Sequence, residues 1–157
     1  MRLSRSWIAF LSLAVALAAA SPLRAAEDTE GEVRNFVQGF LNAVTNLDVS
    51  QLGKMYAPGQ ATTFVRNGTI TYGWDAIQHQ AQSAVGIAMR DSFEVSAEDV
   101  KVTLIGPQNA YVVTPITLTV QTPAGNTMKR GALTLVLEKR AGKWVILHEH
   151  RAMNCIP

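Results

Sequence analysis

The pattern of apolar and polar positions changes once along this chain, from helical spacing before Arg90 to alternation after it. Within residues 33–44 the apolar side chains recur every three or four positions, and Thr29 with Glu32 forms a capping-box pattern ahead of them. These features predict an amphipathic helix of about four turns. The polar, acidic residues 26–32 are expected to form a short leader into that helix.

Two more helices are predicted before the pattern changes. Asp48, with Gln51 three residues later, repeats the capping pattern and predicts a short helix that ends at Pro58. A third helix is expected after Gly73, because the apolar residues that follow fall on one helical face: Trp74, Ile77, Ala81, Ala84, Val85 and Ala88.

The other segments are predicted to be strands. Asn67-Gly68 lies between runs rich in β-branched and aromatic residues, 61–66 and 69–72, which is the strongest short-range signal for a β-hairpin. Because Pro115 lacks an N–H, we expect a bulge or an edge position there. Four long alternating segments are separated by turns that contain Gly: Phe93–Leu104, Ala110–Gln121, Met128–Lys139 and Trp144–Met153. The pattern predicts an α+β fold in which three N-terminal helices cover one face of a bent antiparallel sheet, with a cavity between the layers.

The last segment carries the clearest candidate chemistry. A period of two divides it into two faces: Trp144, Ile146, His148 and His150 on one, and Val145, Leu147, Glu149 and Arg151 on the other. We expect His148 and His150 on the concave face, where a neutral imidazole can act as a base, bond a carbonyl or bind a metal. The alternative is that they close the polar end of a pocket, hydrogen-bonded to the backbone or to Tyr56.

The strand before it is apolar on both sides, with Leu133, Leu135 and Leu137 on one and Ala132 and Val136 on the other. A sheet covered by helices needs only one apolar face. The second face therefore predicts a homodimer through the sheet, since large exposed apolar patches are uncommon on monomers.

The N-terminus has the features of a secretory signal peptide over residues 1–26. Arg2 and Arg5 precede an apolar run, Ile8–Ala20, and small residues end the segment near Ala25 or Ala26. The run is too short to span a membrane, which takes roughly twenty residues. We therefore expect a periplasmic or secreted protein whose single domain covers residues 27–157.

Removing this segment changes the charge of the chain. The full sequence has a net charge of +2, but without Arg2, Arg5 and Arg24 eleven Lys and Arg stand against twelve Asp and Glu, a net charge of −1. A nearly neutral chain without long basic runs argues against nucleic acid or an anionic membrane as the partner. The single cysteine, Cys155, excludes an internal disulfide, and it is interpreted as a terminal thiol, with an intermolecular disulfide or a nucleophile as alternatives.

The order of these elements resembles the SnoaL-like branch of the nuclear-transport-factor-2-like superfamily over about residues 30–153. The resemblance implies a cone-shaped curved sheet wrapped by helices, a cystatin-like roll with a pocket, often dimeric through the sheet. The residues that carry it are Asn46-Leu47-Asp48, Met55-Tyr56-Ala57, Asn67-Gly68 with Gly73, Ala76-Ile77, and Gly142 to His150.

The family hosts isomerases, dehydratases, cyclases and association modules, so the fold does not supply a function. In its ketosteroid-isomerase type an Asp base lies on the first strand, a position that falls near Val65 here, and residues 61–65 hold no carboxylate. Where the oxyanion-site tyrosine of that type would project, the first helix offers Phe36, Gln38 and Phe40. We therefore identify no catalytic machinery of this type.

The candidate pocket residues combine aromatic rings with polar tips, which suit a small apolar or aromatic ligand: Tyr56, Phe64, Tyr72, Trp74, His148 and His150. No metal site is assigned, because zinc needs three or four protein ligands, Glu149 is expected to point away, and His79 falls opposite the apolar stripe of its helix. No cofactor is assigned either.

Three functions follow from these features. The first is an exported, homodimeric domain that binds a small ligand. The second is an isomerase or lyase that uses His150 with His148 or Tyr56 as acid–base groups. The third is a protein-association module that uses the second apolar face of the sheet. An interior filled by Phe36, Phe40, Phe64 and Trp74 would favour the third.

Overall fold

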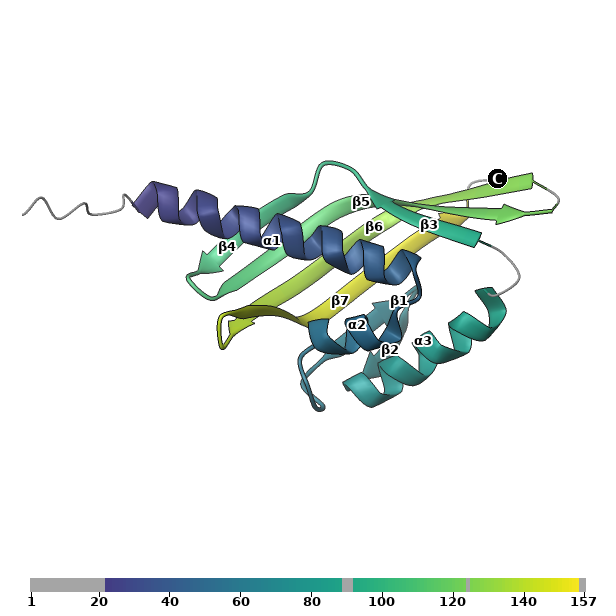
Figure 1. Cartoon of the computed structure of the whole chain (residues 1–157), viewed down its shortest axis with the longest axis horizontal. Coiled ribbons are helices and arrows are strands. Elements are labelled where there is room, and N and C mark those ends of the chain that lie inside the picture. The colour runs from purple at the N-terminus through teal and green to yellow at the C-terminus, as the bar shows by residue number, and fades with distance from the viewer. Residues whose placement is uncertain (1–21, 89–91, 124, 156–157) are drawn as a thin grey trace, which may run out of the picture.

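A curved sheet with helices on its concave side forms the body of the molecule (Figure 1). The computed structural model describes residues 22–88, 92–123 and 125–155, so the predicted signal peptide lies mostly outside the described residues. The helices are α1 (Pro22–Thr45), α2 (Val49–Met55) and α3 (Trp74–Ala88). The strands are β1 (Thr63–Arg66), β2 (Thr69–Tyr72), β3 (Ser92–Ala97), β4 (Lys101–Gly106), β5 (Asn109–Thr122), β6 (Gly125–Arg140) and β7 (Lys143–Cys155). None of the described helices is both long and apolar enough to cross a bilayer.

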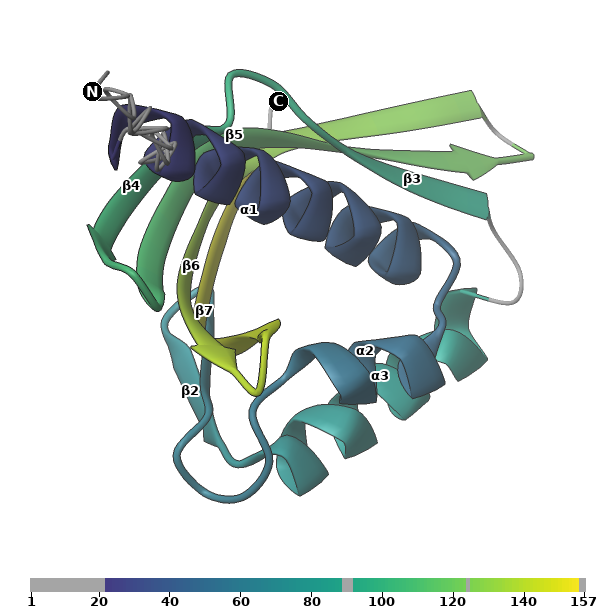
Figure 2. The same cartoon turned by 60° about the vertical axis from the view of Figure 1, so that its left-hand side comes forward.

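The sheet places the β1–β2 hairpin beside the last strand, β7. Its strand order is β2-β1-β7-β6-β5-β3, and β4 also pairs with β5. The long strands β5, β6 and β7 form the predicted antiparallel meander, whereas β1 pairs with β7 in parallel. Figure 2 shows the result, with α1 across one end of the curved sheet and α2 and α3 near the β1–β2 hairpin. The predicted α+β fold class is confirmed.

Local signals placed α2, α3 and the hairpin correctly. The side chain of Asp48 caps α2, its Oδ1 accepting from the backbone N–H of Gln51 at 2.8 Å. Asn67 and Gly68 have φ values of 48° and 85°, the left-handed conformation that a two-residue type I′ hairpin turn requires.

The first helix starts earlier than predicted. α1 begins at Pro22, so the expectation that residues 26–32 form a leader is wrong. Thr29 does not cap the helix; its hydroxyl donates to the carbonyl of Ala25, one turn back, at 2.7 Å. Such a bond is compatible with an uninterrupted helix, so the capping-box pattern lies within α1 and not at its start.

The predicted strand over residues 93–104 is two strands, and Pro115 explains the break. The carbonyl of Pro115 accepts from the N–H of Glu98 at 3.2 Å, so its nitrogen, which has no hydrogen, faces the same neighbour. Beside it, the hydroxyl of Thr114 donates to the carbonyl of Glu98 at 2.7 Å, and Asp99 turns the chain with a φ of 48°. Instead of a bulge or an edge at Pro115, the sheet has an interrupted partner strand.

The core lies between the helices and the concave face. Its fully buried side chains include Phe40, Leu133, Leu135, Leu137 and Ile146. Phe64 is also buried, and Phe36 and Trp74 pack against this core. These four aromatic side chains therefore fill much of the interior, which favours the association module over a ligand held between the helices and the sheet.

Candidate functional site

A bulge in β7 decides which side chains face the interior. Along the β6–β7 ladder Leu137 pairs with Ile146, but Val136 pairs with His148. Leu147 is therefore an extra residue in β7 and has no partner on β6. Such a bulge shifts the alternation of every following side chain by one position.

The shift reverses the predicted faces at the end of the chain. Ile146 is fully buried, and after the bulge the next fully buried residue is Glu149, while His150 is exposed. The prediction that His148 and His150 lie on the concave face with Ile146 is wrong. Glu149 and Arg151, predicted to point outward, lie on the inner face instead.

On that inner face, Glu149 forms a network with Tyr56 and Arg151. The hydroxyl of Tyr56 donates to Oε2 of Glu149, and Nη2 of Arg151 donates to Oε1. Both oxygens of the fully buried carboxylate thus have a partner, which a buried charge requires. The Nε of Arg151 is buried and has no hydrogen-bond partner among the described residues.

Helix α2 brings Tyr56 to this network. Tyr56 is the C-cap of α2 and bridges to Ile146 of β7, next to the bond from the N–H of Ala57 to the carbonyl of Ile146 at 2.9 Å. Its ring stacks on Trp74, with centroids 5.0 Å apart. A Cβ added to Gly53 would lie 3.1 Å from Cζ2 of this indole, so glycine there permits the close approach of α2.

The electrostatics favour a charged pair beside a neutral phenol. Burial raises the pKa of Tyr56 well above its usual 10.0, and the negative charge of Glu149 raises it further. Burial alone would lower the pKa of Arg151, but the charge of Glu149 more than offsets this, so that pKa is raised. Tyr56 is therefore a hydrogen-bond donor at neutral pH, and Arg151 remains a cation.

The outer face of the sheet carries the two histidines at its centre. Nδ1 of His148 and the hydroxyl of Thr63 are hydrogen-bonded at 2.6 Å. Burial lowers the pKa of His148 below its usual 6.5, and His150 adds to that effect. Each histidine belongs to a row of paired residues across the sheet: Tyr72, Thr63, His148, Val136 and Tyr111 in one, and Ile70, Val65, His150, Thr134 and Val113 in the other.

The sheet thus separates the six predicted pocket residues into two groups. Tyr56, Phe64 and Trp74 belong to the inner side, whereas Tyr72, His148 and His150 lie on the outer face. They do not line one pocket. For the same reason, Tyr56 cannot work together with the histidines as an acid–base group.

A cavity that is open to solvent lies elsewhere on the concave side, between the β1–β2 hairpin and α3, and Thr71 is the one buried residue of its lining. Its volume is about 310 Å³, and it is lined by Arg66, Asn67, Thr69, Thr71 and Gln80. Nε2 of Gln80 donates to the hydroxyl of Thr71 at 2.8 Å, which links α3 to the hairpin. None of these residues was a sequence candidate. The available signal was the spacing of Gln80, an exposed polar residue three positions after the buried Ile77 and therefore close to the same side of α3.

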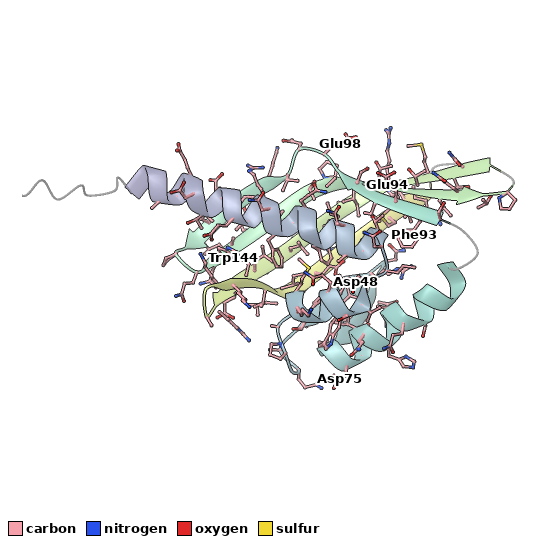
Figure 3. The ribbon with its side chains drawn as sticks, viewed as in Figure 1. Asp48, Asp75, Phe93, Glu94, Glu98 and Trp144 are labelled. Carbon is pink, nitrogen blue, oxygen red and sulfur yellow. The ribbon has the colours of Figure 1, made fainter. Side chains whose placement is uncertain are left out.

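The described residues bring no three His, Cys, Asp or Glu side chains together where they could hold a metal ion. Figure 3 shows Asp48 and Asp75 apart from each other and from Glu94 and Glu98, which lie along β3 and the turn after it, and His79 is an exposed residue of α3.

Comparison with protein families now places the chain. The model of the SnoaL-like domain matches residues 33–154, which include the sheet, the hairpin and all the residues of the cavity. The chain belongs to the SnoaL-like family. A search of curated proteins finds none that matches it.

Solved structures with the same fold are distant in sequence. A protein of unknown function from Mycobacterium tuberculosis, Rv3472, has a TM-score of 0.74 at 17% identity, covering 87% of this chain and 78% of that one. An NTF2-like superfamily protein from Salmonella enterica has a TM-score of 0.70 at 14% identity, covering 80% and 91%. A protein from Streptomyces avermitilis, provisionally named a dehydratase of the NTF2-like family, has a TM-score of 0.71 at 15% identity, covering 83% and 99%. At these identities the likeness extends to the fold alone.

Proposed function

We propose that this chain is an exported small-molecule-binding domain of the SnoaL-like family, and that its ligand occupies the cavity between the β1–β2 hairpin and α3. The observation that carries the proposal is the cavity of about 310 Å³, which is at the lower end of the size range of small-molecule sites. Its polar groups come from β1, β2, the turn between them and α3, and they converge on one space.

The polar groups of the lining change the class of ligand that is expected. Hydroxyl, amide and guanidinium groups line the cavity together with the apolar parts of the same side chains, while the aromatic rings of Tyr56, Phe64 and Trp74 belong to the inner core. A ligand here exchanges hydrogen bonds with water for hydrogen bonds with protein, so it needs polar groups of its own.

A thermal-shift screen of small molecules tests the proposal by blocking the cavity. Gln80→Trp places a large side chain in it, and His79→Trp places the same side chain on the exposed surface of the same helix. Compounds that stabilise the wild-type protein are expected to stabilise His79→Trp and to lose their effect on Gln80→Trp. Compounds that stabilise all three proteins equally would place the ligand site elsewhere.

Catalysis by the histidines has less support. His148 is hydrogen-bonded to Thr63 on the outer face, and His150 is exposed there, on the other side of the sheet from the cavity. An isomerase or lyase activity would have to use the groups that line the cavity instead.

A second copy of the chain is the proposed partner of the outer face. This face exposes four large apolar side chains in the two rows that contain the histidines, and their exposed fractions are 39–59%: Ile70, Tyr72, Tyr111 and Val113. Light scattering after size exclusion is expected to give a dimer for the wild type and a monomer for Tyr111→Lys. Gln108→Lys, an exposed turn residue, is the control and should stay dimeric. A monomeric wild type at high concentration would contradict the proposal.

Export rests on the signal-like segment at residues 1–26. Expression of the full chain in a Gram-negative host is expected to give a periplasmic protein whose mass lacks this segment. An uncleaved protein in the cytoplasmic fraction would contradict export.

A further inference from the structure

We propose that the hairpin cavity binds the carboxylate of a small organic acid, with Arg66 as its principal anchor. The inference rests on the proposed function, because it names the ligand class of the same cavity. Its basis is the set of lining groups whose donors and acceptors are not used by bonds within the protein.

Internal hydrogen bonds leave mainly donors facing the cavity. Oδ1 of Asn67 accepts from the backbone N–H of Met153 at 3.0 Å, so the amide NH₂ of Asn67 is the part left for a ligand. The hydroxyl of Thr71 accepts from Nε2 of Gln80, which leaves its own hydrogen to donate. Gln80 contributes the amide oxygen as an acceptor, and the hydroxyl of Thr69 can serve either way.

The charge of the lining is positive. Arg66 lines the cavity and has no ion-pair partner within the described part of the chain. No carboxylate is among the lining residues. Beside Arg66 in the parallel ladder, Arg151 lies on the same face of the sheet, but Glu149 balances its charge. One unbalanced guanidinium therefore remains.

One guanidinium with two neutral donors suits a carboxylate. The planar fork of arginine bonds both carboxylate oxygens, and the two donors can fill their other lone pairs. A phosphate monoester carries about two negative charges and three acceptor oxygens, so a single arginine would leave about half of its charge without a partner. The volume also admits the carbon skeleton of a small acid next to its carboxylate.

Matched pairs of acids and amides test the inference. Benzoate with benzamide, cinnamate with cinnamamide and hexanoate with hexanamide differ chiefly in charge, and phenyl phosphate is the phosphate probe. Each is titrated up to 10 mM, on the order of the weakest affinity of interest, into the ¹⁵N-labelled protein while amide chemical shifts are followed. At least one acid is expected to shift the amides of Asn67 and Thr71, at least about tenfold more tightly than its amide partner.

Two variants assign the effect to the anchor. Arg66→Gln should weaken binding of that acid by at least about tenfold, because a charge-assisted hydrogen bond is lost. Arg130→Gln removes an exposed arginine from β6, outside the cavity lining, and should leave binding unchanged. Unshifted spectra with every acid would overturn the inference, as would tighter binding of phenyl phosphate than of any acid. If amides bind as well as acids and Gln80→Trp abolishes both, the carboxylate inference fails while the proposed function stands.

Discussion

After the bulge, the two faces of β7 differ in how far their polar side chains are buried and hydrogen-bonded. On the inner face Glu149 is fully buried, and both of its oxygens are bonded, one to Tyr56 and one to Arg151. On the outer face His148 shares one hydrogen bond with Thr63, and its neighbour His150 is exposed. The difference shows that position relative to the bulge, rather than residue type, decides which groups must be partnered. It also predicts that equal substitutions on the two faces have unequal effects.

Inserting one alanine between His148 and Glu149 tests the faces that the bulge sets and has the largest expected effect. The insertion moves every later residue of β7 by one position, which turns Glu149 and Arg151 outward and His150 into the core. We expect a loss of more than about 5 kcal/mol in the free energy of unfolding, comparable to the whole stability of a small domain. Urea unfolding followed by circular dichroism measures it. Deletion of Leu147 is the control, since it removes the unpaired residue and leaves the faces of all later residues unchanged. Equal losses for the two variants would show that the alternation after the bulge does not decide which residues must be buried.

Arg151→Met breaks the inner network from one side and has the second largest effect. It leaves the carboxylate of Glu149 buried without its cation, which costs about 3–5 kcal/mol in the free energy of unfolding. The double variant Glu149→Gln/Arg151→Met removes both charges and should recover most of the loss. Urea titrations of the two variants provide the comparison. A double variant no more stable than Arg151→Met would argue against a charged Glu149.

The sequence predicted the elements well where the signal is local. The capping side chain of Asp48 and the Asn67-Gly68 turn act within a few residues, and both are confirmed. The helix start predicted from Thr29 was wrong, because a threonine hydroxyl can either cap a helix or donate to a carbonyl one turn back inside it. Pro115 correctly marked an irregularity, although the break appears in the partner strands β3 and β4.

The candidate site was harder to predict because its determinant is non-local. Residues 146–148 contain no Gly or Pro, so nothing in their own sequence indicates a bulge. The bulge is a property of how β7 pairs with β6, and one extra residue is enough to reverse the faces of all later residues. The cavity was missed for a similar reason. Gln80 and the hairpin meet only in the folded chain. Most of the aromatic residues that were predicted to line a pocket belong to the core instead.

The same conservative change on each face gives a smaller, sharper test. Tyr56→Phe removes the hydroxyl that bonds the buried carboxylate and should cost about 1.5–3 kcal/mol, the range for a hydrogen bond to a charged group. Tyr72→Phe removes a hydroxyl from the exposed outer face and should change stability by less than about 0.5 kcal/mol. Both values come from urea unfolding at neutral pH. Similar losses for the two variants would contradict the contrast between the faces.

The pH dependence of stability gives the smallest effect, on the outer face. Because burial lowers the folded-state pKa of His148, the unfolded chain binds a proton more readily once the pH falls below about 6.5. This contribution to stability is complete above that pH, falls as the pH drops below it, and levels off below the folded-state pKa. His148→Gln should therefore lose less stability between pH 7 and pH 5 than the wild type, as measured by thermal unfolding across that range. His79→Gln replaces an exposed histidine of α3 and is the matched control, expected to follow the wild-type profile. If His148→Gln follows it too, the partly buried imidazole makes no contribution to the acid sensitivity of the fold.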